Sequence, residues 1–119
     1  MNENKQQEFI NYLTSQYEEL AKKEKTLRMD QRKDEANHVR VQMNIVQIFQ
    51  TVFQVSLKKA NGNSVKENFL DQLEKIPESW EKALENARAH QNVEQELIEN
   101  LKFQMRDSIR EQFLKVVNQ

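Results

Sequence analysis

The chain contains no cysteine among its 119 residues, and only one glycine and one proline. The absence of cysteine excludes a disulfide framework, a thiolate nucleophile and a zinc site with cysteine ligands. A single glycine excludes a glycine-rich phosphate-binding loop. Sheets need frequent turns built from Gly, Pro, Asn and Asp, and the sequence has one such cluster, Asn61-Gly62-Asn63. These absences predict an all-α fold.

The sequence also lacks an excess of charge of one sign and a long apolar run. Its formal net charge is -1, so no overall field favours nucleic acid or an anionic membrane. The most apolar stretch, residues 45–57, is too short and too rich in glutamine to cross a bilayer. The amino terminus is polar and does not resemble a signal peptide. We expect a cytoplasmic protein that does not bind membranes.

Apolar side chains recur every three or four residues along the chain, which predicts helices and argues against disorder. We expect four helices of similar length, over residues 4–28, 30–60, 64–89 and 92–117. Each expected start has a residue type that caps helices, in order Asn4, Asp30, Ser64 and Asn92. Gly62 suits the left-handed position that ends a helix.

Pro77 lies inside the third expected helix and allows two interpretations. It could begin a new helix, or it could kink a continuing one. Apolar residues keep steps of three and four across it, which favours one kinked helix: Phe69, Leu73, Ile76, Trp80, Ala83 and Ala87. A further alternative joins the last two helices into one rod past Ala89. Equal lengths and short connections favour an antiparallel, up-down-up-down four-helix bundle, with the third helix kinked or broken at Pro77.

Residues 45–57 have the widest apolar surface in the chain. At 100° per residue, Gln47, Gln50, Thr51 and Gln54 fall on one narrow stripe. The rest of the circumference is apolar, with Ile45, Val46, Ile48, Phe49, Val52, Phe53, Val55 and Leu57. A helix that is apolar over more than half its circumference needs neighbours on most sides. We therefore expect this segment to be the central helix of the bundle.

Antiparallel folding would gather several ionisable residues at one end of the bundle. The candidate metal ligands are Glu35, His38, His90 and Glu94, with Glu24 as a supporting carboxylate. Glu35-x-x-His38 has the spacing that diiron bundles use, and such nitrogen and oxygen ligands suit zinc, iron or manganese. However, the chain has one such motif and not two, so solvated charge at a bundle end is the competing interpretation. Apart from such an ion, we expect no cofactor.

A basic stripe on the last helix, formed by Lys102, Arg106 and Arg110, could contact a phosphate backbone. Asp107 and Glu111 lie beside it, and no recognition-helix motif is present. We therefore interpret the stripe as a solvated face and expect no nucleic-acid partner. The serines and threonines have no nucleophile–base context, so we expect no enzymatic activity.

Two groups of apolar residues lie beside the main apolar seams of their helices. The first helix has Phe9, Ile10, Tyr12 and Leu13, and the last has Ile98, Phe103, Leu114 and Val117. Helices that are apolar on two sides usually contact two partners. The sequence therefore predicts a helical-bundle module that binds another protein or itself, with a homodimer or larger homo-oligomer expected. A metal-binding bundle is the alternative.

Overall fold

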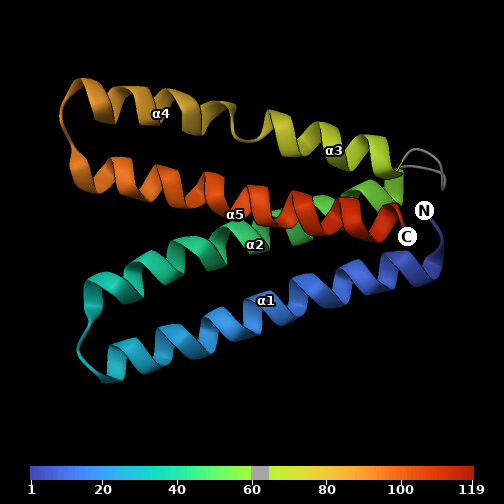
Figure 1. Cartoon of the computed structure of the whole chain (residues 1–119), viewed down its shortest axis with the longest axis horizontal. Coiled ribbons are helices and arrows are strands. Elements are labelled where there is room, and N and C mark those ends of the chain that lie inside the picture. The colour runs from blue at the N-terminus through green and yellow to red at the C-terminus, as the bar shows by residue number, and fades with distance from the viewer. Residues whose placement is uncertain (60–64) are drawn as a thin grey trace.

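A computed structural model of the chain describes residues 1–59 and 65–119. Its helices are α1 (Glu3–Met29), α2 (Lys33–Lys59), α3 (Val65–Lys75), α4 (Glu78–Ala89) and α5 (Val93–Val117). Figure 1 shows α3 and α4 end to end as one bent helix, so the molecule is an all-α four-helix bundle as predicted. The expected helix end at Gly62 and the cap at Ser64 lie outside the described residues.

Two of the expected helix starts are wrong and one is confirmed. Asn2 caps α1 in place of Asn4, because its Oδ1 accepts a hydrogen bond from the Lys5 backbone N–H at 2.8 Å. Asp30 is the C-cap of α1 and does not begin α2. Asn92 caps α5 as predicted, accepting from the Gln95 N–H at 3.1 Å. Asp30 belongs to the end of α1 because its backbone N–H still donates to the Thr26 carbonyl, at 3.1 Å.

The turns that join α1 to α2 and α4 to α5 have the same structure. Backbone N–H groups of Arg32 and Asn92 donate to carbonyls five residues earlier, each at 2.8 Å. Gln31 and Gln91 adopt positive φ angles of 61° and 55°. This is the Schellman arrangement, which commonly places glycine in the left-handed position. Because the chain reverses at Gln91, the alternative of a single rod past Ala89 is wrong.

The bend in the third helix lies at Ile76 and Pro77. Proline has no backbone N–H to continue the helical hydrogen bonds, so α3 ends at Lys75 and α4 begins at Glu78. The two segments continue end to end with a bend, which is the kinked helix that the apolar steps had favoured. The apolar side nevertheless faces the core across the bend, although Leu84 is buried and Ala83 is only half-buried.

The centre of the core is a cluster of four phenylalanines, one each from α1, α2, α3 and α5: Phe9, Phe53, Phe69 and Phe113. Every pair of these rings has its centroids within 6.2 Å. Sixty residues separate Phe9 from Phe69 and also Phe53 from Phe113. The same interval separates Gln31 from Gln91. The two helical hairpins are therefore built alike, although their sequences show no evident repeat.

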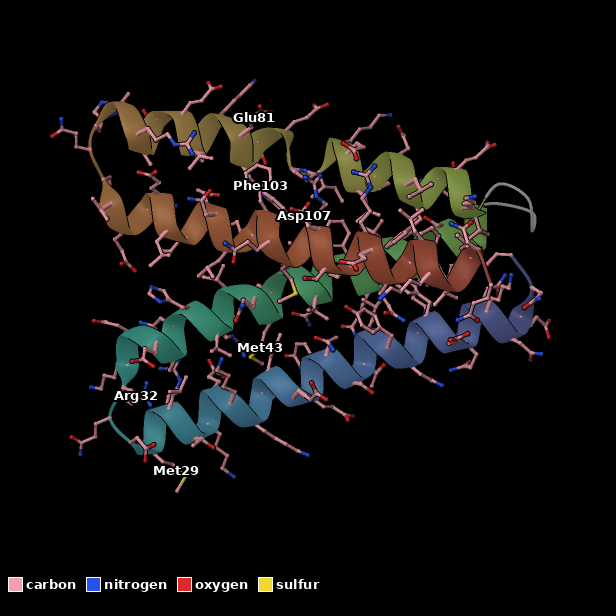
Figure 2. The ribbon with its side chains drawn as sticks, in the orientation of Figure 1. Met29, Arg32, Met43, Glu81, Phe103 and Asp107 are labelled. Carbon is pink, nitrogen blue, oxygen red and sulfur yellow. The ribbon has the colours of Figure 1, made fainter. Side chains whose placement is uncertain are left out.

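Away from this cluster the two hairpins diverge, as Figure 1 shows at the end that holds the two Schellman turns. Over the helices as a whole, α4 packs on α5, α5 on α2, and α2 on α1. A second small core of Leu27, Ala36, Val39 and Met43 closes the α1–α2 tip, and Figure 2 shows Met43 between these two helices. The molecule measures 44 × 35 × 22 Å. In so thin a molecule, some helix faces lack a neighbour.

Candidate protein-binding surface

The structure brings together two of the predicted metal ligands. His38 on α2 and Glu94 on α5 lie with Nε2 and Oε1 2.8 Å apart, which joins the two hairpins. Glu35 is instead paired with Arg32. The Nδ1 of His90 lies 2.9 Å from the backbone carbonyl of Asn86 on its own helix. The predicted set of four therefore reduces to one contacting pair.

The supporting carboxylate, Glu24, is also engaged by cations. Its oxygens lie 2.9 Å from Arg28 and 3.7 Å from Arg40. Within residues 1–59 and 65–119, no group of three or more histidine or acidic side chains is placed to hold a metal ion. The metal site stays a prediction, and His38 and Glu94 are the two predicted ligands that lie in contact.

The basic stripe of α5 is occupied by contacts inside the chain. Arg106 donates to the Leu73 carbonyl at 2.9 Å and pairs with Asp107, while Arg110 pairs with Glu74 at 2.7 Å. Lys102 lies 3.0 Å from Glu99, whose side chain is almost entirely buried. The stripe thus ties α5 to α3 and to itself. It is less solvated than the sequence suggested, because Lys102 and Arg106 are only partly exposed.

Most of the apolar residues beside the seams of α1 and α5 pack within the chain. Phe9 and Leu13 are fully buried, and Ile10 and Tyr12 pack against the same core. Phe103 projects from α5 toward α4 in Figure 2, with its ring 5.7 Å from that of Trp80. Besides packing on α2, helix α1 packs against α5, and α5 packs against α4. Val117 also packs against the core, whereas Ile98 and Leu114 are half-buried, so most of the set does not form the free apolar surface that motivated the prediction of self-association.

A free apolar surface lies instead on α2. Ile45, Val46, Phe49 and Phe53 are buried, as expected for a central helix. Ile48 and Val55, however, are 39% and 41% exposed, so the central-helix prediction is wrong for these two side chains. The reason is the arrangement of the helices: α1, α3 and α5 pack on other sides of α2 and leave the arc that carries Ile48 and Val55 incompletely covered.

This arc is also uncharged. Residues 41–57 contain no Asp, Glu, Lys or Arg, although such residues make up 31% of the chain. We define the outer face of α2 by the exposed side chains of this stretch: Asn44, Gln47, Ile48, Thr51, Gln54 and Val55. Arg40 precedes the stretch, and Lys58 and Lys59 follow it.

A groove of about 340 Å³ runs beside this face, between α2 and α3. Its lining is uncharged except for Lys59, and comprises Thr51, Val52, Val55, Ser56, Lys59, Asn68 and Gln72. On the other side, Thr14 of α1 lines a small hollow together with Gln50 and Gln54. The uncharged surface therefore extends from α2 onto both neighbouring helices.

No family model matches the chain, and neither a curated protein nor a solved structure matches it. None of the described helices combines the length and the apolarity that crossing a bilayer requires. The function is therefore argued from the surface of the chain itself.

The sequence carried a signal for this surface. The absence of charge from residues 41–57 is visible in the sequence, but the angular pattern led us to place Ile48 and Val55 in the interior. Apolar periodicity shows that a helix face is suited to burial. It does not show whether a helix of the same chain or of another chain covers that face.

Proposed function

We propose that this protein is a non-catalytic, cytoplasmic protein-binding module whose binding surface is the outer face of α2. The observation that carries the proposal is the exposure of Ile48 and Val55 on a helix whose other apolar residues are buried or half-buried. A second protein that covered this arc would remove the remaining apolar surface of α2 from water. The absence of cysteine supports the proposed location, since the chain needs no oxidising compartment.

The chemistry of the outer face supports binding of a protein. Interface centres are depleted of charged residues relative to the rest of a protein surface, and this face has none. Ile48, Thr51 and Val55 follow the i, i+3, i+7 spacing of one helix stripe. A partner helix can lay its own apolar stripe along such a row. Thr51 and Gln54 could hydrogen-bond the polar groups of that partner.

Matched variants test this proposal. Wild-type protein, Ile48→Lys and Gln104→Lys would be immobilised at equal density and exposed to lysate of the source cells and to the free purified chain. Gln104 is exposed on α5 and serves as the control position. We expect wild type and Gln104→Lys to retain the same proteins, and Ile48→Lys to lose them, because a lysine on the stripe would be desolvated on binding.

The result would go against the proposal if all three proteins retained the same species in equal amounts, or if none retained any. Circular dichroism of the three proteins checks that the fold is kept. Ile48 is partly exposed, so a lysine there can extend its charged end into water in the free chain.

The contact between His38 and Glu94 favours metal binding as a second candidate function. Zinc that binds only the folded chain must raise the melting midpoint. We expect this shift in wild type and its loss in His38→Ala, with Glu35→Ala and His90→Ala testing the other predicted ligands. A midpoint that excess zinc, manganese and iron all leave unchanged would exclude the candidate.

A further inference from the structure

A surface that pairs with the same surface of a second copy must not bring like charges together. In a twofold interface the same patch is used on both sides, so charges within it approach like charges. The exposed sides of α1, α4 and α5 carry many charged residues. The outer face of α2 carries none, and the net charge of -1 produces little repulsion between whole chains. Among the described helices, α2 thus has the surface best suited to pairing with itself.

The polar side chains of this face can also form hydrogen bonds with the same side chains of a second copy. Asn44, Gln47 and Gln54 have amide side chains, and Thr51 has a hydroxyl group. Each of these groups both donates and accepts hydrogen bonds. The same residue types on a second copy therefore satisfy them, whereas a carboxylate or an ammonium group would need a partner of opposite charge.

The spacing of the apolar residues fits an antiparallel pair of α2 helices. Ile48 lies three residues before Thr51 and Val55 lies four after it. In an antiparallel pair centred near Thr51, Ile48 of one copy is level with Val55 of the other.

The ends of the face favour the same direction. In the antiparallel pair, Lys58 and Lys59 are level with Asn44 of the second copy. A parallel pair would instead bring these lysines next to the same lysines of the copy, where they repel. Antiparallel helices also place their macrodipoles in the favourable orientation.

We infer that the occupant of the outer face of α2 is the same face of a second copy, with the two α2 helices antiparallel about a twofold axis near Thr51. This inference rests on the proposed function, because it names the partner of that binding surface. The chain is then a homodimer whose centre is the stripe of Ile48, Thr51 and Val55.

Opposite charges placed at the axis provide the decisive experiment. Thr51 is exposed, so Thr51→Glu and Thr51→Lys should leave the single chain folded. In sedimentation equilibrium we expect wild type and the neutral control Thr51→Gln to be dimers. Each charged variant should weaken dimerisation by about thirtyfold or more, because two like charges meet at the axis. An equimolar mixture of the two charged variants should recover the dimer.

The natural absence of cysteine allows the direction of the pair to be tested. Under mild oxidation, a mixture of Ile48→Cys and Val55→Cys should form mainly the mixed disulfide, because only an antiparallel pair brings these positions within bonding range. Disulfides formed mainly between identical variants would show a parallel pair and would overturn the antiparallel arrangement.

Three other outcomes would overturn the inference: a monomeric wild type at roughly 100 μM, charged variants that remain dimers, or a mixture that stays monomeric. The same measurements distinguish failure of self-pairing from failure of the proposed function. If purified wild type is a monomer but Ile48→Lys still loses proteins that wild type and Gln104→Lys retain, self-pairing fails and the binding surface stands. If the immobilised variants do not differ, the proposed function fails as well.

Discussion

At the scale of single residues, the two Schellman turns place glutamine where glycine is the usual choice. Gln31 and Gln91 have positive φ angles, which cost a residue with a Cβ about 1 kcal/mol or more. We expect Gln31→Gly and Gln91→Gly each to stabilise the fold by about 1 kcal/mol in denaturant titrations. The controls Gln31→Ala and Gln91→Ala keep the Cβ and should stay within about 0.5 kcal/mol of wild type. Glycine variants no more stable than the alanine variants would refute this reasoning.

Glu99 is a buried carboxylate that the sequence did not identify. It is 2% exposed, its Oε1 accepts from Lys102 and Gln95 at 3.0 and 3.1 Å, and its Oε2 has no hydrogen-bond partner. Removing one partner of a buried ion pair leaves an uncompensated charge. We therefore expect Lys102→Met to lower the free energy of unfolding by about 3 kcal/mol.

The double variant Glu99→Leu/Lys102→Met is the control for that prediction. Replacing both members of a buried pair with apolar groups is often neutral or stabilising. The double variant should therefore be more stable than Lys102→Met alone, as measured by the midpoint of denaturant unfolding. The opposite order would show that the carboxylate of Glu99 stabilises the fold without Lys102.

Burial of the large core side chains was predictable from the apolar pattern, including Phe49 and Phe53 of α2. Phe69 and Leu73 were placed correctly because they lie on one continuous seam. Glu99 was missed because a glutamate in a charge-rich helix looks solvated in sequence, whereas here α5 has a neighbour on more than one side. The pairing of His38 with Glu94 follows from the approach of α2 to α5, which no local pattern encodes.

At the scale of helices, α2 contributes Phe53 to the four-phenylalanine cluster, where the ring is completely buried. Truncation would leave a cavity that three other rings line. We expect Phe53→Ala to cost about 3–5 kcal/mol, a large part of the roughly 5–15 kcal/mol that stabilises an ordinary domain. Gln47→Ala, at an exposed position of the same helix, should stay within about 0.5 kcal/mol. Equal denaturation midpoints would mean that the cluster is not the centre of the fold.

The helices and the ends at Ala89 and Val117 were predictable, whereas the starts of the first two helices were not. The apolar period gave all four helices because each is long and regular. Asp30 was assigned to the wrong helix because aspartate suits both a helix start and the polar end of another. The bend of the third helix at Pro77 was predictable, because proline lacks the backbone N–H and the apolar seam continues across it. Periodicity reports which side of a helix faces the core and gives little information on where its backbone bends.

At the scale of the whole molecule, two similar hairpins are joined tightly at the phenylalanine cluster and diverge toward their turns (Figure 1). This divergence could not be read from the sequence, because equal helices with short turns are also compatible with a closed bundle. α4 packs on α5, and the arc of α2 that carries Ile48 and Val55 stays exposed.

Pairing of that arc with a second copy is tested most directly by the melting midpoint as a function of protein concentration. A dimer that forms only in the folded state makes the midpoint depend on concentration. We expect the midpoint of wild type to rise between roughly 1 and 100 μM, and that of Thr51→Glu to stay constant over the same range. A constant midpoint for wild type, or an equal rise for Thr51→Glu, would contradict self-pairing through the outer face of α2.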